Sequence, residues 1–372
     1  MKILHFYKTA IPESIGGIEV VIDTLASKHT QDGLDVKVLA LSSHDYKDKL
    51  SINGYKLYRA KRNFEIASTG FSLSVFKKFA QLAKESDIIH YHFPWPFMDL
   101  VHLMKRPPGK PAVLTYHSDI IRQKHLLKLY RPLKRKFLNS VDRIVATSPN
   151  YLETSQVLSR FQGKTSVIPI GLEASLYKSL GLDRTQYWGE RFAGKFFLFV
   201  GVLRYYKGLH ILLDAMKYRD YPMIIVGAGP IEKELWDHAK RLRLTNVHFL
   251  GEISDADKCA LLRLCYAVVF PSHLRSEAFG VSLLEGALFG KPLISSELGT
   301  GTSYINLDQD TGLVVPPNNS DAFRSAMDLL WENPKFAAKC GESAYRRFEQ
   351  LFSADRMADS YCGLYQELLG VK

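Results

Sequence analysis

The sequence predicts an α/β fold built from two doubly wound parallel sheets, and three observations support this prediction. The chain has 372 residues, which at ~150 residues per domain favours two domains. Short apolar runs alternate with amphipathic stretches along the whole length, a pattern typical of βαβ units. The pattern restarts at Phe196–Val200. The preceding segment, 180–194, lacks a clear period, so the sequence places the domain boundary there.

Both halves are expected to alternate strands with helices. In the first half the predicted strands are Lys2–Phe6, Asp35–Leu41, Lys56–Arg59, Ile88–His92, Ala112–Tyr116, Arg143–Thr147 and Thr165–Ile168. Helical spacing there predicts helices at Gly17–Thr30 and Leu73–Glu85. The predicted strands of the second half are Phe196–Val200, Met223–Val226, Val247–Leu250, Ala267–Phe270, Pro292–Ser295 and Gly312–Val315. Its predicted helices are Gly208–Met216, Ile231–Arg243, Ala256–Cys265, Ser282–Phe289 and Asp321–Glu332.

These elements predict an N-terminal domain over residues 1–185 and a C-terminal domain over 186–350. Terminal helices over 351–372 are expected to cross back to the N-terminal domain. In folds of this kind ligands bind at the C-terminal ends of the strands, next to helix N-termini.

The composition excludes several classes of protein, and the net charge differs between the two halves of the chain. Hydrophobic residues make up 46% and charged residues 23%, which excludes disordered, collagen-like and coiled-coil proteins. The formal net charge is +11; residues 1–190 carry 28 Lys and Arg against 17 Asp and Glu, while residues 191–372 carry 21 of each. The whole excess lies in the first half, so the two halves are expected to bind different partners.

The chain is expected to be cytoplasmic. Its four cysteines show no Cys-x-x-Cys pair and no zinc-ligand spacing, so reduced thiols are expected. No apolar run approaches the ~18–20 residues of a membrane span. His5 and Lys8 interrupt the apolar N-terminal segment that a signal peptide would need.

Two glycine turns are candidate phosphate sites. Gly227 and Gly229 lie between a predicted strand and a helix, where helix N-termini favour anions. Glu232 stands where a dinucleotide fingerprint would have its third glycine, and a plain tight turn is equally consistent with this segment. The loop with Gly16 and Gly17 also lies before a predicted helix, so it could bind an anionic ligand in the same way.

Arg204 and Lys207 follow the first strand of the second half and open a helix. Two cations at such a terminus suit a diphosphate, although two solvated surface cations are the simpler alternative. Glu277 lies in a loop after a buried strand, and Glu285 lies eight residues further along. Carboxylates accept hydrogen bonds from hydroxyls, so this pair can hold two polyols, such as a hexose and a ribose. Two such glutamates taken alone are usually surface residues.

At this point the sequence resembles a known family. Glu277-Ala-Phe-Gly-Val-Ser-Leu-Leu-Glu285 is similar to the E-x7-E motif of retaining nucleotide-sugar glycosyltransferases of family 4. Four further segments follow in that family's order, and the likeness spans essentially the whole chain. These are the Gly16-Gly17 loop, Thr115-Tyr-His117-Ser-Asp119, the Lys207-Gly208 turn and Val226-Gly-Ala-Gly-Pro230. The resemblance implies the GT-B fold, in which two Rossmann-like domains face each other across a cleft.

The resemblance also implies a role for each matching residue. Glu277 would hold the donor hexose and Glu285 the ribose of the nucleotide. Lys207 and Arg204 would neutralise the departing diphosphate. His117 would reach the sugar from the first domain; without the resemblance it reads more simply as a buried structural histidine.

Further donor-binding positions follow from the same resemblance. Backbone donors at Gly17 and at Phe279–Gly280 would help to hold the diphosphate, with Gly16 and Gly229 in the neighbouring turns. Ile253 would lie against the base. No Asp-x-Asp motif is present, so no metal and no cofactor are expected, with Lys207 and Arg204 in place of a divalent ion.

The chain departs from the family pattern at two places. Val202 stands where an arginine is common, so Arg204, two residues later, would have to take its place. The loop from Glu297 to Tyr304 replaces a common Gly-Gly-x-Pro-Glu segment. This variant resembles bacterial mannosyltransferases of polysaccharide and O-antigen assembly, which use GDP-mannose.

A basic segment in the first half is a candidate membrane surface. Residues 120–138 carry seven Lys and Arg and no acidic residue, including Lys134, Arg135 and Lys136. Ile121, Leu126, Leu129, Leu133 and Phe137 are expected to share one face, with Pro132 bending or dividing the helix. Such a stripe flanked by cations suits anionic lipid, or a solvated helix packed on its own domain. We expect a peripheral position on the inner face of the cytoplasmic membrane, a lipid-linked or oligosaccharide acceptor, and no nucleic acid.

Two other functions remain open at this level. A nucleotide-sugar 2-epimerase shares the fold, although the variant loop and the basic first half argue against it. A non-enzymatic nucleic-acid or membrane-binding protein is the other alternative. A dehydrogenase is disfavoured because the G-x-G-x-x-G fingerprint is missing.

Overall fold

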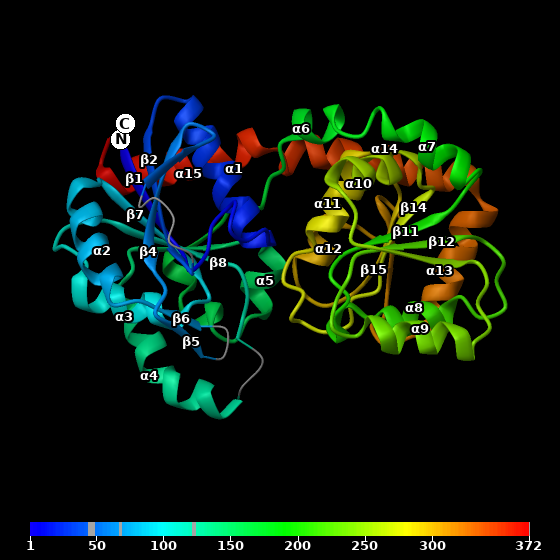
Figure 1. Cartoon of the computed structure of the whole chain (residues 1–372), viewed down its shortest axis with the longest axis horizontal. Coiled ribbons are helices and arrows are strands. Elements are labelled where there is room, and N and C mark those ends of the chain that lie inside the picture. Colours follow the sequence, from blue (N-terminus) through cyan, green and yellow to red (C-terminus); the bar gives the residue numbers. More distant parts are fainter. Residues whose placement is uncertain (44–48, 67–68, 121–123, 372) are drawn as a thin grey trace. The chain divides into compact units, whose positions relative to one another are not determined.

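The computed structural model describes residues 1–43, 49–66, 69–120 and 124–371. The chain folds into two compact units, unit 1 from Met1–Gly171 with Ala354–Lys372 and unit 2 from Leu172–Ser353. Figure 1 shows an α/β arrangement in each of them. The chain passes from unit 1 to unit 2 at 171/172, before the segment 180–194 where the sequence places the boundary. That segment contains helix α7 (Arg184–Arg191).

Unit 1 is built on an eight-stranded sheet with the order β10-β9-β8-β7-β1-β2-β4-β3. All neighbours are parallel except β3 and β4, which pair antiparallel. The strands are β1 (Lys2–Phe6), β2 (Asp35–Ser42), β3 (Lys49–Ile52), β4 (Tyr55–Lys61), β7 (Ile88–Phe93), β8 (Ala112–Tyr116), β9 (Arg143–Ala146) and β10 (Thr165–Val167). Strands β5 (Phe64–Ile66) and β6 (Thr69–Phe71) pair separately.

The two faces of this sheet differ in chemistry because successive side chains of a strand point to opposite faces. Phe6 and Tyr91 pack with Phe79 of α2 on one face. On the other face, His5 of β1 and His90 of β7 are direct neighbours. The helices of unit 1 are α1 (Gly17–Gln31), α2 (Ser74–Glu85), α3 (Pro96–Lys105), α4 (Lys124–Ser140), α5 (Pro149–Thr154) and α15 (Ala354–Leu369).

Helix α15 is last in the sequence but belongs to unit 1. It lies beside α1 in Figure 1, and His29 of α1 bonds the carbonyl of Ala358 through Nε2 at 3.0 Å. Tyr361 and Tyr365 of α15 reach the histidine face of the sheet, where Tyr365 contacts His90. The C-terminal helix therefore closes the core of unit 1.

Unit 2 contains a fully parallel six-stranded sheet with the order β13-β12-β11-β14-β15-β16. The strands are β11 (Phe197–Val200), β12 (Met223–Val226), β13 (Val247–Gly251), β14 (Ala267–Phe270), β15 (Leu293–Ser296) and β16 (Gly312–Val315). The sequence order reverses between β11 and β14, and such a switch point is where open α/β sheets bind ligands. Continuous apolar runs form these strands because helices cover both faces of the sheet.

The helices of unit 2 are α6 (Ala174–Ser179), α7, α8 (Leu209–Ala215), α9 (Glu232–Arg241), α10 (Asp255–Leu264), α11 (Val281–Leu288), α12 (Gly301–Ile305), α13 (Ser320–Glu332) and α14 (Pro334–Leu351). Short 3₁₀ turns occur at Leu158–Arg160, Gln162–Lys164 and Tyr205–Lys207. The fold-class prediction of two Rossmann-like α/β domains is confirmed. In the described ranges of the chain, no helix is long and apolar enough to cross a membrane.

Helix α4 differs from its prediction in one respect. Pro132 lies inside one helix and does not divide it. The expected single apolar stripe is wrong, because Leu129 is 81% exposed whereas Phe137 is fully buried. At ~100° per residue, positions eight apart drift by about 80° around a helix, so these two side chains face different surroundings. Ile121 lies outside the described residues, and the side chain of Leu126 is likewise not described.

Candidate active site

Lys207 and Glu277 come together at the switch point of unit 2. Lys207 ends the turn after β11, and Glu277 lies in the loop after the neighbouring strand β14. Lys207 Nζ lies 2.6 Å from Glu277 Oε2, and the two side chains are only 12% and 11% exposed. Ser272 donates a second hydrogen bond to the same oxygen, at 3.2 Å. The sequence predicted both residues as site residues, and the structure joins them as a buried ion pair.

Backbone geometry explains why Lys207 reaches Glu277. Gly208 has a φ of +71°, and a Cβ there would lie 2.0 Å from the carbonyl oxygen of Pro271. Only glycine permits this approach, which packs the loop after β11 against the loop after β14. The Lys207 ammonium also lies over the ring of Phe270, 4.7 Å from its centroid. Burial opposes the charge of Lys207, but the Glu277 carboxylate more than offsets it and holds the pKa above its usual value.

Glu285 forms a second buried charge cluster on α11. Its Oε1 lies 2.9 Å from Nζ of Lys258 on α10, with side-chain exposures of 6% and 19%. Burial works against the charge of Lys258, yet Glu285 and Tyr177 beside it raise its pKa. Burial, and then the Glu285 carboxylate, raise the pKa of Tyr177, which is hydrogen-bonded to Glu285. Neither glutamate is therefore a solvated surface residue.

Sequence reasoning missed Lys258 and Tyr177. Lys258 lies in the first turns of an ordinary amphipathic helix, and Tyr177 in the short helix α6. Neither belongs to a motif, and their role depends on tertiary packing against Glu285. No signal in the sequence could have identified them.

The variant loop after β15 is fixed by hydrogen bonds. Arg275 donates to the carbonyl oxygens of Leu298 and Gly299 at 3.0 and 3.1 Å. Glu297 Oε1 accepts from the backbone N–H of Gly299 at 2.7 Å and from the Ser303 hydroxyl at 2.8 Å. The loop therefore has a defined shape next to the segment that carries Glu277.

Phe279 and Gly280 lie between the two glutamates. Phe279 is buried, and Gly280 has a φ of +100° as the residue before α11. A Cβ on Gly301 would come within 2.4 Å of the Phe279 ring, so α12 packs tightly on this segment. This packing holds the start of α11 and thereby the position of Glu285.

The other predicted donor-binding residues differ in setting. A Cβ at Gly229 would meet the backbone of Leu203, with its oxygen at 2.3 Å, so this glycine packs two loops together. Arg204 and Val202 are exposed, and Ile253 is partly buried in the loop after β13. Arg204 contributes repulsion to Lys207 and is therefore near it in unit 2.

Gly16 and Gly17 begin α1 in unit 1. A Cβ on Gly16 would lie 2.6 Å from the Glu19 carboxylate, whereas nothing lies within 4 Å of a Cβ on Gly17. Glu19 is buried in the first turn and accepts a hydrogen bond from Thr9 at 2.5 Å. A carboxylate therefore already occupies part of the positive end of this helix.

His117 follows β8 in unit 1 and is buried. Its Nε2 lies 3.1 Å from Nδ1 of His92, and its backbone N–H donates to the carbonyl oxygen of Phe93. Burial lowers the pKa of His117 to about 3, so its imidazole is neutral near pH 7.

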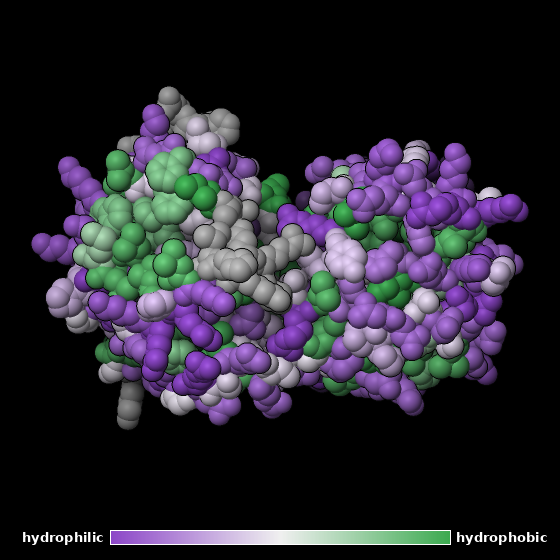
Figure 2. Space-filling model, turned by 90° about the horizontal axis from the view of Figure 1, so that it is seen from below, coloured by the Kyte–Doolittle hydropathy of each residue, from purple (hydrophilic) through white to green (hydrophobic). Residues whose placement is uncertain are grey.

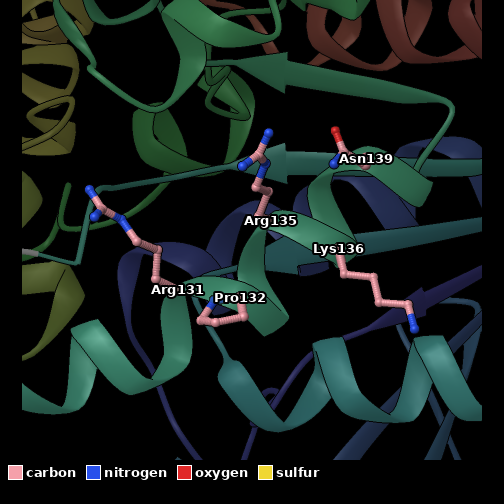
Figure 3. Close-up of a pocket in the computed structure, with 5 residues that line it drawn as sticks. All are labelled: Arg131, Pro132, Arg135, Lys136 and Asn139. Carbon is pink, nitrogen blue, oxygen red and sulfur yellow. The ribbon is translucent and has the colours of Figure 1, made fainter.

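The three basic residues predicted on α4 do not share a face. Lys134 is partly buried, and burial lowers its pKa, an effect that the charges of Asp119 and Asp99 oppose. Arg135 and Lys136 are exposed and line a hollow with Arg131, Pro132 and Asn139. In Figure 3 Arg131 and Arg135 extend in a similar direction, whereas Lys136 points away from them. Consecutive helical residues lie ~100° apart, which explains the separation of Lys134.

The α4 basic face, meaning Lys128, Arg131 and Arg135, is exposed along the helix. Leu129, also exposed, lies among these cations in the sequence. Figure 2 views the molecule from the side on which α4 lies in Figure 1, and it shows apolar surface beside strongly hydrophilic surface on unit 1.

Comparisons with known proteins identify the family of the chain. Residues 15–176 match the model of Glycosyltransferase Family 4, and residues 188–347 match that of Glycosyl transferases group 1. The chain is 58% identical to D-rhamnosyltransferase WbpZ of Pseudomonas aeruginosa, over 95% of this chain and 93% of that protein. It is 50% identical to O-antigen chain mannosyltransferase C of Escherichia coli, over 100% of both.

Solved structures show the same architecture. Sucrose-phosphate synthase from Thermosynechococcus elongatus matches with a TM-score of 0.81 at 20% identity, over 99% of both chains. Anabaena HepE in complex with UDP matches with a TM-score of 0.78 at 20% identity, over 99% of this chain and 100% of that one. At this identity the likeness establishes the GT-B fold alone. The family models and the two bacterial relatives, together with the paired glutamates, show that the chain belongs to the family 4, group 1 glycosyltransferases.

Proposed function

We propose that the chain transfers mannose, or a closely related hexose, from GDP-mannose to a lipid-linked or polysaccharide acceptor in O-antigen assembly. The observation that carries this proposal is the pair of buried carboxylates in unit 2, Glu277 paired with Lys207 and Glu285 paired with Lys258. The two bacterial relatives, named as a rhamnosyltransferase and an O-antigen mannosyltransferase, support the sugar class and the process.

The residue types suit departure of a nucleoside diphosphate. As the bond between the hexose and the diphosphate breaks, negative charge builds on phosphate oxygens, and fixed cations stabilise it. Lys207 supplies this charge from a largely buried position, with its side chain 12% exposed, and Arg204 adds to it from the exposed part of the same turn. We propose that these two cations act in place of a divalent metal, and that the anomeric configuration is retained.

The ion pair gives Lys207 and Glu277 a shared task. Glu277 holds the ammonium 2.6 Å from its carboxylate, so the cation is positioned before any donor arrives. A diphosphate that approaches Lys207 would share the ammonium with Glu277, while the carboxylate accepts hydrogen bonds from hexose hydroxyls. Glu285, fixed by Lys258, is the group we assign to the ribose hydroxyls.

Nucleoside diphosphates and transfer assays test the proposal. In a thermal-shift panel of GDP, UDP and ADP, GDP is expected to raise the melting midpoint most. Glu285→Gln is expected to abolish that shift, because a neutral amide accepts hydroxyl hydrogen bonds more weakly than a carboxylate. Equal shifts by all three nucleotides would contradict the choice of GDP. Turnover of the donor without an acceptor to an epimerised sugar would favour the 2-epimerase.

We further propose that unit 1 docks on the inner face of the cytoplasmic membrane through the α4 basic face. Each cation near an anionic surface contributes ~1 kcal/mol, and exposed Leu129 offers an apolar contact. Reversing Lys128, Arg131 and Arg135 to Glu is expected to abolish co-sedimentation with phosphatidylglycerol liposomes. The matched control reverses Lys240, Lys335 and Lys339, three exposed lysines of unit 2, and is expected to keep binding. Equal loss in both variants would show that net charge alone governs binding.

A further inference from the structure

Three buried histidines in unit 1 form one continuous hydrogen-bonded row. His117 Nε2 lies 3.1 Å from His92 Nδ1, and His92 Nε2 lies 3.1 Å from His5 Nδ1. The rings of His92 and His117 stack with centroids 5.4 Å apart, as do those of His5 and His92. The row crosses the switch point of the unit 1 sheet, where β1 and β7 are neighbours.

All three imidazoles are neutral. Burial lowers the pKa of His5 and of His117 to about 3, and it lowers the pKa of His92 well below its usual value. A neutral imidazole has one N–H donor and one acceptor nitrogen. Two links between three neutral rings therefore use two of the three protons, and the third must lie at one end of the row.

Only two proton arrangements satisfy both links. In the first, His5 donates from Nδ1 to His92, His92 donates from Nδ1 to His117, and His117 carries its proton on Nδ1. In the second every donor is reversed, and His5 carries its proton on Nε2. Because the central ring has a single proton, the tautomer of His117 and the tautomer of His5 change together.

The surroundings of His5, at one end of the row, favour the first arrangement. His5 is fully buried, and its Nε2 is a buried atom with no hydrogen-bond partner among the residues that the structure describes. The second arrangement would place an N–H there, and buried N–H groups without a partner are rare. The first leaves only a lone pair at that point.

We infer that His92 is a positioning residue: with His5 it fixes His117 in the tautomer that carries its proton on Nδ1, which offers the donor sugar a hydrogen-bond donor. This inference rests on the proposed function and on the contact with the donor hexose that the family resemblance implies for His117. The orientation of each ring is set by the bond that its other nitrogen makes.

A metal site is the competing explanation for these histidines. His5, His90 and His92 bring one ring nitrogen each within 4.8 Å of one another. Both nitrogens of His90 are already bonded, however, to Tyr365 at 2.6 Å and Thr115 at 2.7 Å. Both nitrogens of His92 are bonded as well, which leaves one nitrogen, His5 Nε2, where a zinc ion needs three or four ligands.

Nitrogen-15 NMR of histidine-labelled protein reads the tautomers directly. His117 is assigned by the signal that disappears in His117→Ala. In the full-length protein we expect the His117 proton on Nδ1, and a proton on Nε2 would overturn the inference. His92→Phe removes the donor to His117 and is expected to change its tautomer. His92→Asn, whose amide N–H lies near the former Nδ1, is expected to keep it.

Measurements of kcat/KM then show whether His92 acts by positioning His117 or only by packing in the core. His92→Phe is expected to lower kcat/KM for the donor about tenfold, the equivalent of one hydrogen bond. In a His117→Ala background the same change is expected to have no further effect, since His92 acts through His117. A further loss there would overturn the positioning role.

The control is His102→Phe, a buried histidine of α3 that bonds Ser140 outside the row. It is expected to leave the His117 tautomer unchanged and kcat/KM within about twofold of the parent. If the protein transfers no hexose at all, the proposed function fails, while the NMR result still decides the arrangement of the row.

Discussion

The switch points of the two sheets bury polar side chains in opposite ways. In unit 2 the buried groups are charged and paired, Lys207 with Glu277 and Lys258 with Glu285. In unit 1 the buried groups at β1, β7 and β8 are histidines that have lost their charge. Burial of a charged group away from water is unfavourable. Unit 2 offsets this cost by pairing opposite charges, whereas in unit 1 the histidines lose the proton that would make them charged.

The difference determines what each region tolerates. A buried ion pair stabilises only while both partners are present, because a lone buried charge is strongly unfavourable. A neutral histidine needs no partner of opposite charge, but it resists protonation. The unit 2 site should therefore be sensitive to substitution of one charge, and the unit 1 row to acid.

The largest expected effect is at Lys207. Lys207→Ala removes a buried cation and should lower turnover by ~10²-fold or more. It should also lower the free energy of unfolding by about 3–5 kcal/mol, because Glu277 is left uncompensated. Kinetic assays and denaturant titrations measure the two effects.

A double variant separates those effects. Lys207→Met with Glu277→Gln removes both charges, so stability should recover relative to Lys207→Ala while activity stays lost. If stability does not recover in the double variant, the two side chains do not act as a pair.

Acid should destabilise unit 1 through its neutral histidines. The pKa of His5, His102 and His117 is lowered to about 3 in the folded protein, with burial as the main cause. The unfolded chain takes up these protons below pH ~6.5, so the folded state loses stability as the pH falls from ~6.5 towards 3. Each histidine should contribute ~1.4 kcal/mol per pH unit in this window.

His102→Gln offers a direct check on the acid effect. It removes one of the three histidines, so stability should fall less steeply between pH 6.5 and 5 in urea titrations. An unchanged slope would mean that His102 does not titrate on unfolding.

Removal of Lys258 should affect donor binding more than chemistry. Lys258→Met leaves Glu285 without its ammonium partner, and we expect the donor KM to rise about tenfold while kcat changes less, since ribose contacts act on binding. The matched control is Lys240→Met, an exposed lysine of α9. Equal KM values in the two variants would show that Lys258 does not contribute to donor binding.

The smallest effect is expected at Arg204. This residue is exposed, so Arg204→Ala should change the free energy of unfolding by no more than ~0.5 kcal/mol. We expect a loss of turnover of about tenfold, below that of Lys207→Ala, because solvent screens an exposed cation more than a buried one. A larger loss than at Lys207 would reverse the assigned roles.

Most strands could be predicted from the sequence because they are continuous apolar runs. Lys2–Phe6, Ala112–Tyr116, Met223–Val226 and Ala267–Phe270 match their predicted bounds. Strand β3 was missed because Lys49-Leu-Ser-Ile is short and polar on alternate positions. Helix α3 was missed because it begins at Pro96, and proline at a first helical turn reads in isolation as a break.

The site was predictable only where a motif carries it. Glu277, Glu285 and Lys207 belong to segments with recognisable spacing, whereas Lys258 and Tyr177 enter the site by packing alone. The sequence also did not show that Lys134 is partly buried whereas Arg135 and Lys136 are exposed, because a run of three cations hides the ~100° rotation between helical neighbours. The sequence assigned His117 but not its connection to His92 and His5, because β1, β7 and β8 become neighbours only in the sheet.

Helix α15 has a consequence for the order in which the chain matures. Tyr361 and Tyr365 cap the histidine face, yet they are translated after all of unit 2. Unit 2 is one uninterrupted stretch of sequence, so its core can form as soon as that stretch has been made. The histidine face of the unit 1 sheet stays uncovered until α15 has been made. We therefore expect the reverse of the usual N-terminal-first order of folding, with the histidines reaching their final surroundings only after helix α15 has been made.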